Sequence, residues 1–150
     1  MRDSLYSLRT VFTALLLMFV YSSKAQTKIP YLMISEMQVD DAFEHLQSFL
    51  LEKDYFIKTM DSRQRFVQFK IVSKEKGLFK ADRRYIVNLF VVKNGDSASK
   101  IRLQINSEKL EWNGEVGNAV YYYKDEGLLK DSDTLYDDVI AELKQFYDAI

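Results

Sequence analysis

The sequence contains no cysteine, one proline and a single histidine, His45. Without cysteine, no disulfide can stabilise the fold, no lipid can be attached through a thiol, and no thiol can act as a nucleophile. With one histidine, the usual Cys/His zinc sites and Cys–His catalysis are excluded as well. No phosphate-binding loop or dinucleotide fingerprint is present either. The sequence therefore predicts a domain stabilised by packing alone, with no metal and no cofactor.

An export signal is predicted at the N-terminus. Arg2 and Arg9 precede the uncharged apolar run 11–20, and Ser23-Lys24-Ala25 places small residues at positions −3 and −1 of a cleavage site before Gln26. The alternative is an uncleaved membrane anchor, but the run is only about half of the roughly 20 apolar residues that a span needs. We expect a signal peptide over residues 1–25. The processed protein is then periplasmic or secreted, without a lipid anchor or a transmembrane span.

Residues 26–150 suit one domain with one core. Charge is distributed unevenly along this domain. Residues 26–52 carry one basic residue against five acidic ones, residues 53–102 carry thirteen against five, and residues 103–150 carry four against eleven. A basic middle between two acidic ends predicts that one part of the folded surface is positively charged.

Two amphipathic helices and four strands are predicted. Apolar residues recur at spacings of three and four in both helices, whereas the strands alternate in polarity or are apolar on both faces. The helices are expected over 38–53 and from about 135 to 150, and the strands over 55–60, 65–73, 84–93 and from Lys100 onward. Short connections such as the one at Asn94-Gly95 favour antiparallel pairing, because parallel strands need a long crossover.

The predicted fold class is α+β. We expect a two-layer sandwich in which an antiparallel four-stranded meander carries the N- and C-terminal helices on one face. Residues 107–131 leave two alternatives open. Leu110 and Trp112 continue the fourth strand, and residues 119–123 form either a short fifth strand or an ordered loop. Ser132 or Asp133 is the expected cap of the last helix.

The helix that contains Asp40-Asp41-Ala42-Phe43 leads into the segment 52–57, which reads Glu-Lys-Asp-Tyr-Phe-Ile. A charged turn, strands and a closing amphipathic helix follow. This pattern resembles the helix-grip domains of accessory lipoproteins in outer-membrane protein assembly, over most of residues 36–150. The resemblance implies an α+β fold and a place in the cell envelope. Those lipoproteins are anchored through a cysteine that this chain lacks, and no functional residue is transferred from them.

Motifs for catalysis are weak, so no catalytic residue is predicted. His45 is expected on the solvent-exposed face of its helix. Ser97-Ala98-Ser99-Lys100 matches Ser-x-x-Lys but follows a hairpin turn instead of opening a helix. Gly114-Glu115-Val116-Gly117 has the form of a backbone-clamping loop but lacks flanking basic residues. The acidic pair Asp125-Glu126 lies in the ambiguous region beside three tyrosines, and it is the one carboxylate pair without an evident helix-start role.

Binding has better support than catalysis. We expect an exported, non-enzymatic interaction module of the cell envelope that binds through the sheet face opposite the helices. The residues predicted to bind a partner there are Lys70, Arg84, Ile86, Asn88, Phe90, Arg102 and Gln104. Further positive charge in the adjoining loop comes from Lys74, Lys76, Lys80 and Arg83. The expected partner is an envelope protein or an anionic surface. Nucleic acid is not expected outside the cytoplasm, and no oligomeric state is predicted.

Three other interpretations remain open. The positive charge can simply keep the sheet soluble and block edge pairing. The protein can also be a carrier for a small amphiphile held between the C-terminal helix and the sheet. The pocket of such a carrier would be lined by Trp112, Tyr121, Tyr123, Phe146 and Tyr147. A carboxylate-dependent hydrolase using Asp125 or Glu126 is the third interpretation.

Overall fold

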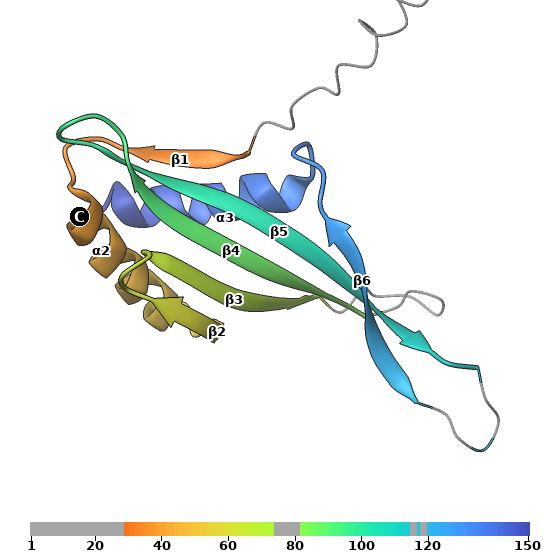
Figure 1. The fold of residues 1–150 in the computed structure, drawn as a ribbon. Helices are drawn as coiled ribbons and strands as arrows, with labels where there is room; N and C mark the ends of the chain where they lie inside the picture. The colour runs from red at the N-terminus through yellow and green to blue at the C-terminus, as the bar shows by residue number, and fades with distance from the viewer. Residues whose placement is uncertain (1–28, 74–81, 115–116, 118–119) are drawn as a thin grey trace, which may run out of the picture.

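The computed structural model describes residues 29–73, 82–114, 117 and 120–150, so the predicted signal peptide lies outside the described residues. Within the described ranges the chain forms one antiparallel sheet of six strands and two helices (Figure 1). The strands are β1 (Tyr31–Ile34), β2 (Phe56–Asp61), β3 (Phe66–Ser73), β4 (Arg83–Lys93), β5 (Ser99–Trp112) and β6 (Tyr121–Leu128). The helices are α2 (Val39–Glu52) and α3 (Thr134–Tyr147).

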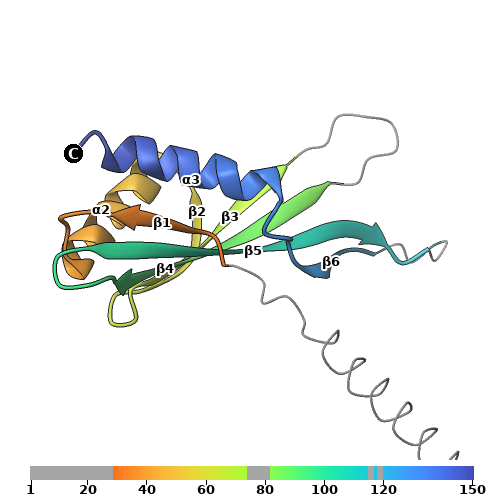
Figure 2. The ribbon, with the colours of Figure 1, turned by 90° about the horizontal axis from the view of Figure 1, so that it is seen from above.

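The elements form two layers. Figure 2 shows α2 and α3 together on one side of the sheet, while the other side of the sheet carries no helix of the described residues. The predicted α+β class with an antiparallel sheet is therefore confirmed. The predicted number of four or five strands is wrong for two reasons. The short strand β1 precedes α2, and the segment around Asp125 belongs to the strand β6.

Strand β5 pairs with three other strands. The strand order is β1-β5-β4-β3-β2, and β6 also pairs with β5. On one edge β5 pairs with β4 over Ser99–Lys109. On its other edge β1 pairs with Ser99–Arg102 and β6 pairs with Asn106–Trp112. Two short strands thus share one edge of β5.

The junction between β1 and β6 is closed by a side chain of α3. At this point the Leu103 N–H donates to the Pro30 carbonyl at 2.9 Å, and the Leu129 N–H donates to the Ile105 carbonyl at 2.8 Å. The Ile105 N–H has no strand partner there and donates instead to the Tyr136 hydroxyl at 3.1 Å. A buried backbone donor that lacked a partner would cost free energy, so Tyr136 completes the edge of the sheet.

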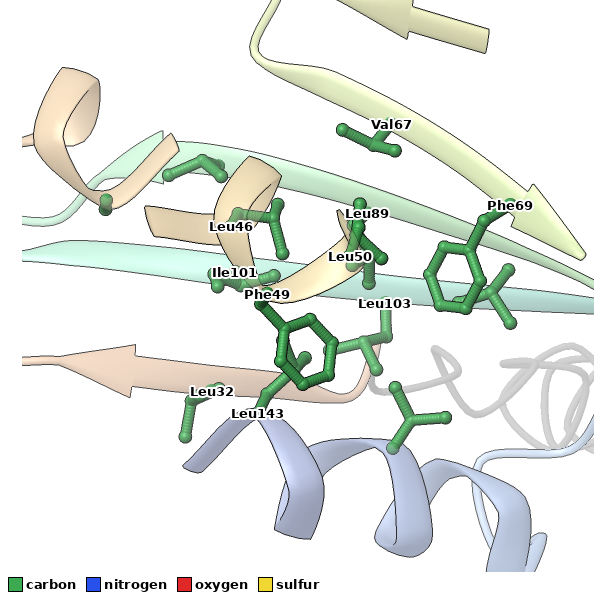
Figure 3. Close-up of a cluster of buried hydrophobic side chains, with 14 of the residues drawn as sticks. Leu32, Leu46, Phe49, Leu50, Val67, Phe69, Leu89, Ile101, Leu103 and Leu143 are labelled. Carbon is green, nitrogen blue, oxygen red and sulfur yellow. The ribbon is translucent and has the colours of Figure 1, made fainter. Parts of the chain in front are cut away.

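The hydrophobic core lies between the helices and the sheet. Alternate residues of β5 point toward the helices, and Ile101, Leu103 and Ile105 are fully buried there. Phe49 of α2 is 1% exposed and contacts both layers (Figure 3). Its ring centroid lies 5.4 Å from that of Phe146 on α3. The two amphipathic helices therefore bury their apolar stripes against each other and against one face of the sheet.

The predicted start of the last helix is confirmed at Asp133. Its side chain accepts a hydrogen bond from the Leu135 N–H at 3.0 Å, which satisfies one of the free donors of the first turn. The predicted turn at Asn94-Gly95 connects β4 to β5. Gly95 has a φ of 81°, which glycine adopts without steric cost.

Unfolding is expected to become easier at alkaline pH because of Tyr55, which connects the end of α2 to α3. Its hydroxyl donates to a Glu142 carboxylate oxygen at 3.0 Å. Burial, followed by this hydrogen bond and the negative charge of Glu142, raises the pKa of Tyr55 from 10.0 to about 12. A tyrosine whose pKa is higher in the folded than in the unfolded chain stabilises the fold fully below pH 10. It loses this contribution as the pH rises through about 12.

The measurement is urea unfolding between about pH 9 and about pH 12 for the wild type and for Tyr55→Phe. We expect the variant to lose less stability over this range, by about 1 kcal/mol, because solvent screening reduces the effect at a partly exposed site. Burial also raises the pKa values of Tyr136 and Tyr147, so the variant keeps part of the alkaline loss. Identical pH profiles for the two proteins would exclude a contribution from Tyr55.

Candidate functional site: the open face of the sheet

The sheet face opposite α2 and α3, called the open face below, carries every residue predicted to bind a partner. The register pairs Lys70 with Ile86, and Gln68 with Asn88 and then Gln104. It also pairs Phe90 with Arg102, and these positions alternate with the residues of the same strands that face the core. Ile86 is itself only 6% exposed, so it offers little surface to a partner. The residues so placed are Lys70, Arg84, Ile86, Asn88, Phe90, Arg102 and Gln104.

Hydrogen bonds between amide groups order the centre of the open face. The Gln68 side chain donates through Nε2 to Asn88 Oδ1 at 2.7 Å. Asn88 in turn donates through Nδ2 to the main-chain carbonyl oxygen of Gln104 at 3.3 Å. Next to these amides the rings of Phe66 and Phe90 lie 4.6 Å apart. The centre of the face therefore contains both amide and aromatic side chains, and their contacts hold them in defined positions.

Three cations of the open face lie over aromatic rings. The Lys70 ammonium is 4.8 Å from the centroid of the Phe56 ring, and the Lys100 ammonium is 4.5 Å from that of Tyr31. The Arg84 guanidinium is 3.8 Å from the Tyr123 ring and also pairs with Glu108. Such contacts hold long flexible side chains close to the sheet.

Within the described part of the chain, two of these cations and Arg102 have no acidic partner. Among the residues that the structure describes, Lys70, Lys100 and Arg102 form no ion pair, whereas Arg84 is compensated by Glu108. The open face thus presents positive charge that nothing within the described part of the chain neutralises. A ligand with negative charge would compensate it.

A shallow hollow of about 230 Å³ lies on the open face. It is lined by Ile29, Phe90, Val92, Arg102 and Gln104. Three of these residues were predicted from the sequence. The alternation that selected Phe90 also indicates Val92, but nothing in the sequence places Ile29 beside the sheet, because its position depends on the pairing of β1 with β5.

The two helices on the other side are acidic. Helix α2 contains four acidic residues and no lysine or arginine, and α3 contains three acidic residues and one lysine. The charges of the molecule are therefore separated, with the acidic helical layer on one side of the sheet and the cationic open face on the other. An anionic surface would attract the molecule with its open face first.

Strands β5 and β6 extend beyond the rest of the sheet as a two-stranded ribbon (Figure 1). The pairing of β4 with β5 ends at Lys109, but β5 continues to Trp112. We call the paired segments 110–112 and 121–123 the aromatic ribbon. On the open-face side Trp112 pairs with Tyr121 and Leu110 pairs with Tyr123. Trp112 is 51% exposed and Tyr121 is 69% exposed.

The predicted carrier pocket is wrong, because its five aromatic residues lie in two separate places. Trp112, Tyr121 and Tyr123 belong to the aromatic ribbon. Phe146 packs against Phe49 in the core, and the Tyr147 hydroxyl donates to the Ala42 carbonyl at 2.5 Å. The extension of β5 past β4 carries the first three residues away from the helices.

Asp125 and Glu126 lie in strand β6 and not in a loop, at a position where the register of β5 and β6 shifts. Asp125 Oδ1 accepts a hydrogen bond from the Gly127 N–H at 2.7 Å. Glu126 accepts one from the Ser107 hydroxyl at 2.9 Å and lies 3.5 Å from Arg83 Nη1. These contacts give both carboxylates a role in shaping the bulge of the strand.

The other motifs stay separate from the open face. His45 is half-buried and its ring lies 6.5 Å from that of Tyr147, so its predicted place on the exposed face of the helix is wrong. Ser97, the serine of the Ser-x-x-Lys match, is exposed in the turn between β4 and β5, and no helix begins there. Glu115 and Val116 of the glycine loop lie outside the described residues. The same holds for Lys74, Lys76 and Lys80.

Within the described ranges, the structure brings together no group of three or more acidic or histidine side chains suited to a metal ion. Neither α2 nor α3, the helices of those ranges, has the length and apolar character needed to cross a membrane.

Comparison with known proteins finds similarity among solved structures. No protein-family model and no curated protein matches the chain. A crystal structure of a DUF4468 family protein from Bacteroides ovatus is similar with a TM-score of 0.46 and 12% sequence identity. The matched region covers 85% of this chain and 90% of that chain.

Proposed function

We propose that the protein is an exported, non-enzymatic interaction module of the cell envelope that binds an anionic partner through its open face. The observation that carries this proposal is the group Lys70, Lys100 and Arg102. These three cations share one face and, among the described residues, have no carboxylate partner. Positive charges that only kept a sheet soluble would not need the ordered amides and the apolar hollow on the same face.

The arrangement suits binding better than catalysis. Arg102 lines a shallow hollow of about 230 Å³, and the amide groups at the centre of the face hydrogen-bond across three strands. The acidic pair that was a candidate for hydrolysis is engaged in the bulge of β6. A face of this kind offers complementary charge and shape to a partner but no activated nucleophile.

The charge reversal Lys70→Glu, Lys100→Glu and Arg102→Glu is expected to abolish binding of anionic partners. Arg84 is left unchanged because its replacement would also disturb Glu108. The measurement is quantitative recovery of envelope components on the immobilised protein, followed by binding of each purified component. We expect affinity to fall at least about tenfold, because three attractive charges become repulsive.

A matched control changes the net charge by the same amount away from the open face. Lys93, Lys130 and Lys144 are all exposed, and their replacement by glutamate provides this control. Equal losses in both triple variants would mean that net charge decides binding and not the open face. The proposal would be refuted if the partners bound the charge-reversed variant with the same affinity as the wild type.

A further inference from the structure

The open face also carries many exposed apolar side chains, which extend from one edge of the sheet to the aromatic ribbon. Tyr31, Met33 and Phe56 are exposed, and the strand register places them on this face. Trp112, Tyr121 and Leu128 lie on the same face along β5 and β6. These side chains are spread over the whole face and are not gathered into one pocket. A broad, flat partner would contact most of them at once.

The chemical type of these side chains points to a lipid surface. Tryptophan and tyrosine combine an apolar ring with a polar group, and both are enriched where hydrocarbon meets headgroups. The ribbon places Trp112 and Tyr121 beyond the end of β4. They therefore lie away from the helical layer, where they can contact the same membrane surface as the rest of the open face.

Charge complementarity selects the kind of membrane. Lys70, Lys100 and Arg102 face the same direction as the exposed rings, and the acidic helices face the opposite one. Near an anionic bilayer this separation attracts the open face and repels the helices. A second copy is disfavoured as the occupant, because two open faces in contact would bring these cations together.

We infer that the open face docks on an anionic lipid membrane, with Trp112 and Tyr121 of the aromatic ribbon among the headgroups and with Lys70, Lys100 and Arg102 against the lipid phosphates. This inference rests on the proposed function and specifies its partner. It assigns the ribbon the role of a shallow anchor and the three cations the role of setting orientation and lipid preference.

The test uses vesicles of phosphatidylcholine alone and vesicles of phosphatidylcholine and phosphatidylglycerol in equal parts. The protein is taken from the host that exports it, and its mass is measured first. Trp112 is the only tryptophan of the sequence, so its fluorescence reports the surroundings of the ribbon directly. We expect the emission to shift to the blue with the anionic vesicles and not with phosphatidylcholine alone, and the shift to weaken as salt is raised.

Variants separate the two contributions. The triple change Lys70→Glu, Lys100→Glu and Arg102→Glu is expected to weaken binding to anionic vesicles by about a hundredfold or more, since each cation near such a surface contributes about fivefold. Trp112→Ala, followed by co-sedimentation with vesicles, is expected to weaken binding about tenfold. Leu51→Ala is the matched control, because Leu51 is 72% exposed on α2. The N-terminal segment is identical in all proteins, so differences between them report the open face.

Each outcome decides the inference. Loss of vesicle binding in the two open-face variants, with retention in Leu51→Ala, supports it. Absence of binding to anionic vesicles, equal binding by all variants, or binding without a change in Trp112 emission overturns it. If the protein does not bind anionic vesicles but binds a purified envelope protein, and the triple variant abolishes that binding, the proposed function is supported and the lipid partner is refuted. If the protein binds neither, the proposed function is refuted as well.

Discussion

Replacing Phe49 by alanine is expected to lower the free energy of unfolding by about 3–5 kcal/mol. Phe49 is 1% exposed and lies where α2, α3 and the sheet meet. Its ring contacts Phe146 at a centroid distance of 5.4 Å and Tyr55 at 6.1 Å. Truncation removes the buried ring and leaves a cavity that two helices and a sheet cannot easily fill. Urea unfolding at neutral pH, followed by circular dichroism, measures the effect.

Phe56→Ala is the matched control for this change. It removes the same side chain from a position that is 65% exposed on the open face. We expect it to cost no more than about 1 kcal/mol, which includes the loss of the contact with the Lys70 ammonium. Similar losses from Phe49→Ala and Phe56→Ala would contradict the assignment of inner and outer faces of the sheet.

The change Tyr136→Phe is expected to cost about 1–3 kcal/mol although it removes a single oxygen atom. The Tyr136 hydroxyl accepts the hydrogen bond of the Ile105 N–H in the gap between β1 and β6. Ile105 is fully buried, so the phenylalanine variant leaves a backbone donor without a partner. Thermal and urea unfolding measure the loss of stability, and hydrogen exchange at the Ile105 amide locates it.

Tyr122→Phe serves as the control for Tyr136→Phe. The Tyr122 hydroxyl donates to Glu111 at 3.4 Å on an exposed part of the ribbon, where water can replace it. Its removal is expected to change stability by less than about 0.5 kcal/mol. If Tyr136→Phe lowers stability no more than this control, the Ile105 N–H has another hydrogen-bond acceptor in the variant.

Elements with a strong local pattern could be predicted from the sequence. Helices α2 and α3 bury the apolar stripes that their spacing indicates, and β3, β4 and β5 follow the expected ranges closely. The alternation of the same strands placed all seven candidate binding residues on one face, because side chains of a strand point alternately to either side. Local periodicity is sufficient wherever an element is long and has one face in the core.

The elements that were missed depend on contacts between distant residues. Strand β1 has four residues, and its strand character comes from pairing with Ser99–Arg102, nearly seventy positions along the chain. Strand β6 is exposed on both faces and contains Gly127, so its sequence lacks the alternation typical of a strand. The carrier pocket failed for a related reason. The sequence shows which residues are aromatic, but only the strand register shows that β5 extends beyond the end of its pairing with β4.

The position of the ribbon at the end of β5 affects how the sequence of the protein can evolve. A two-stranded segment in water has little stability of its own, and here it depends on the continuity of β5 with the folded body. Substitutions at its tip therefore leave the core almost untouched. The length and side chains of this ribbon can therefore vary while the scaffold keeps its packing, so the ribbon and the core evolve under separate constraints.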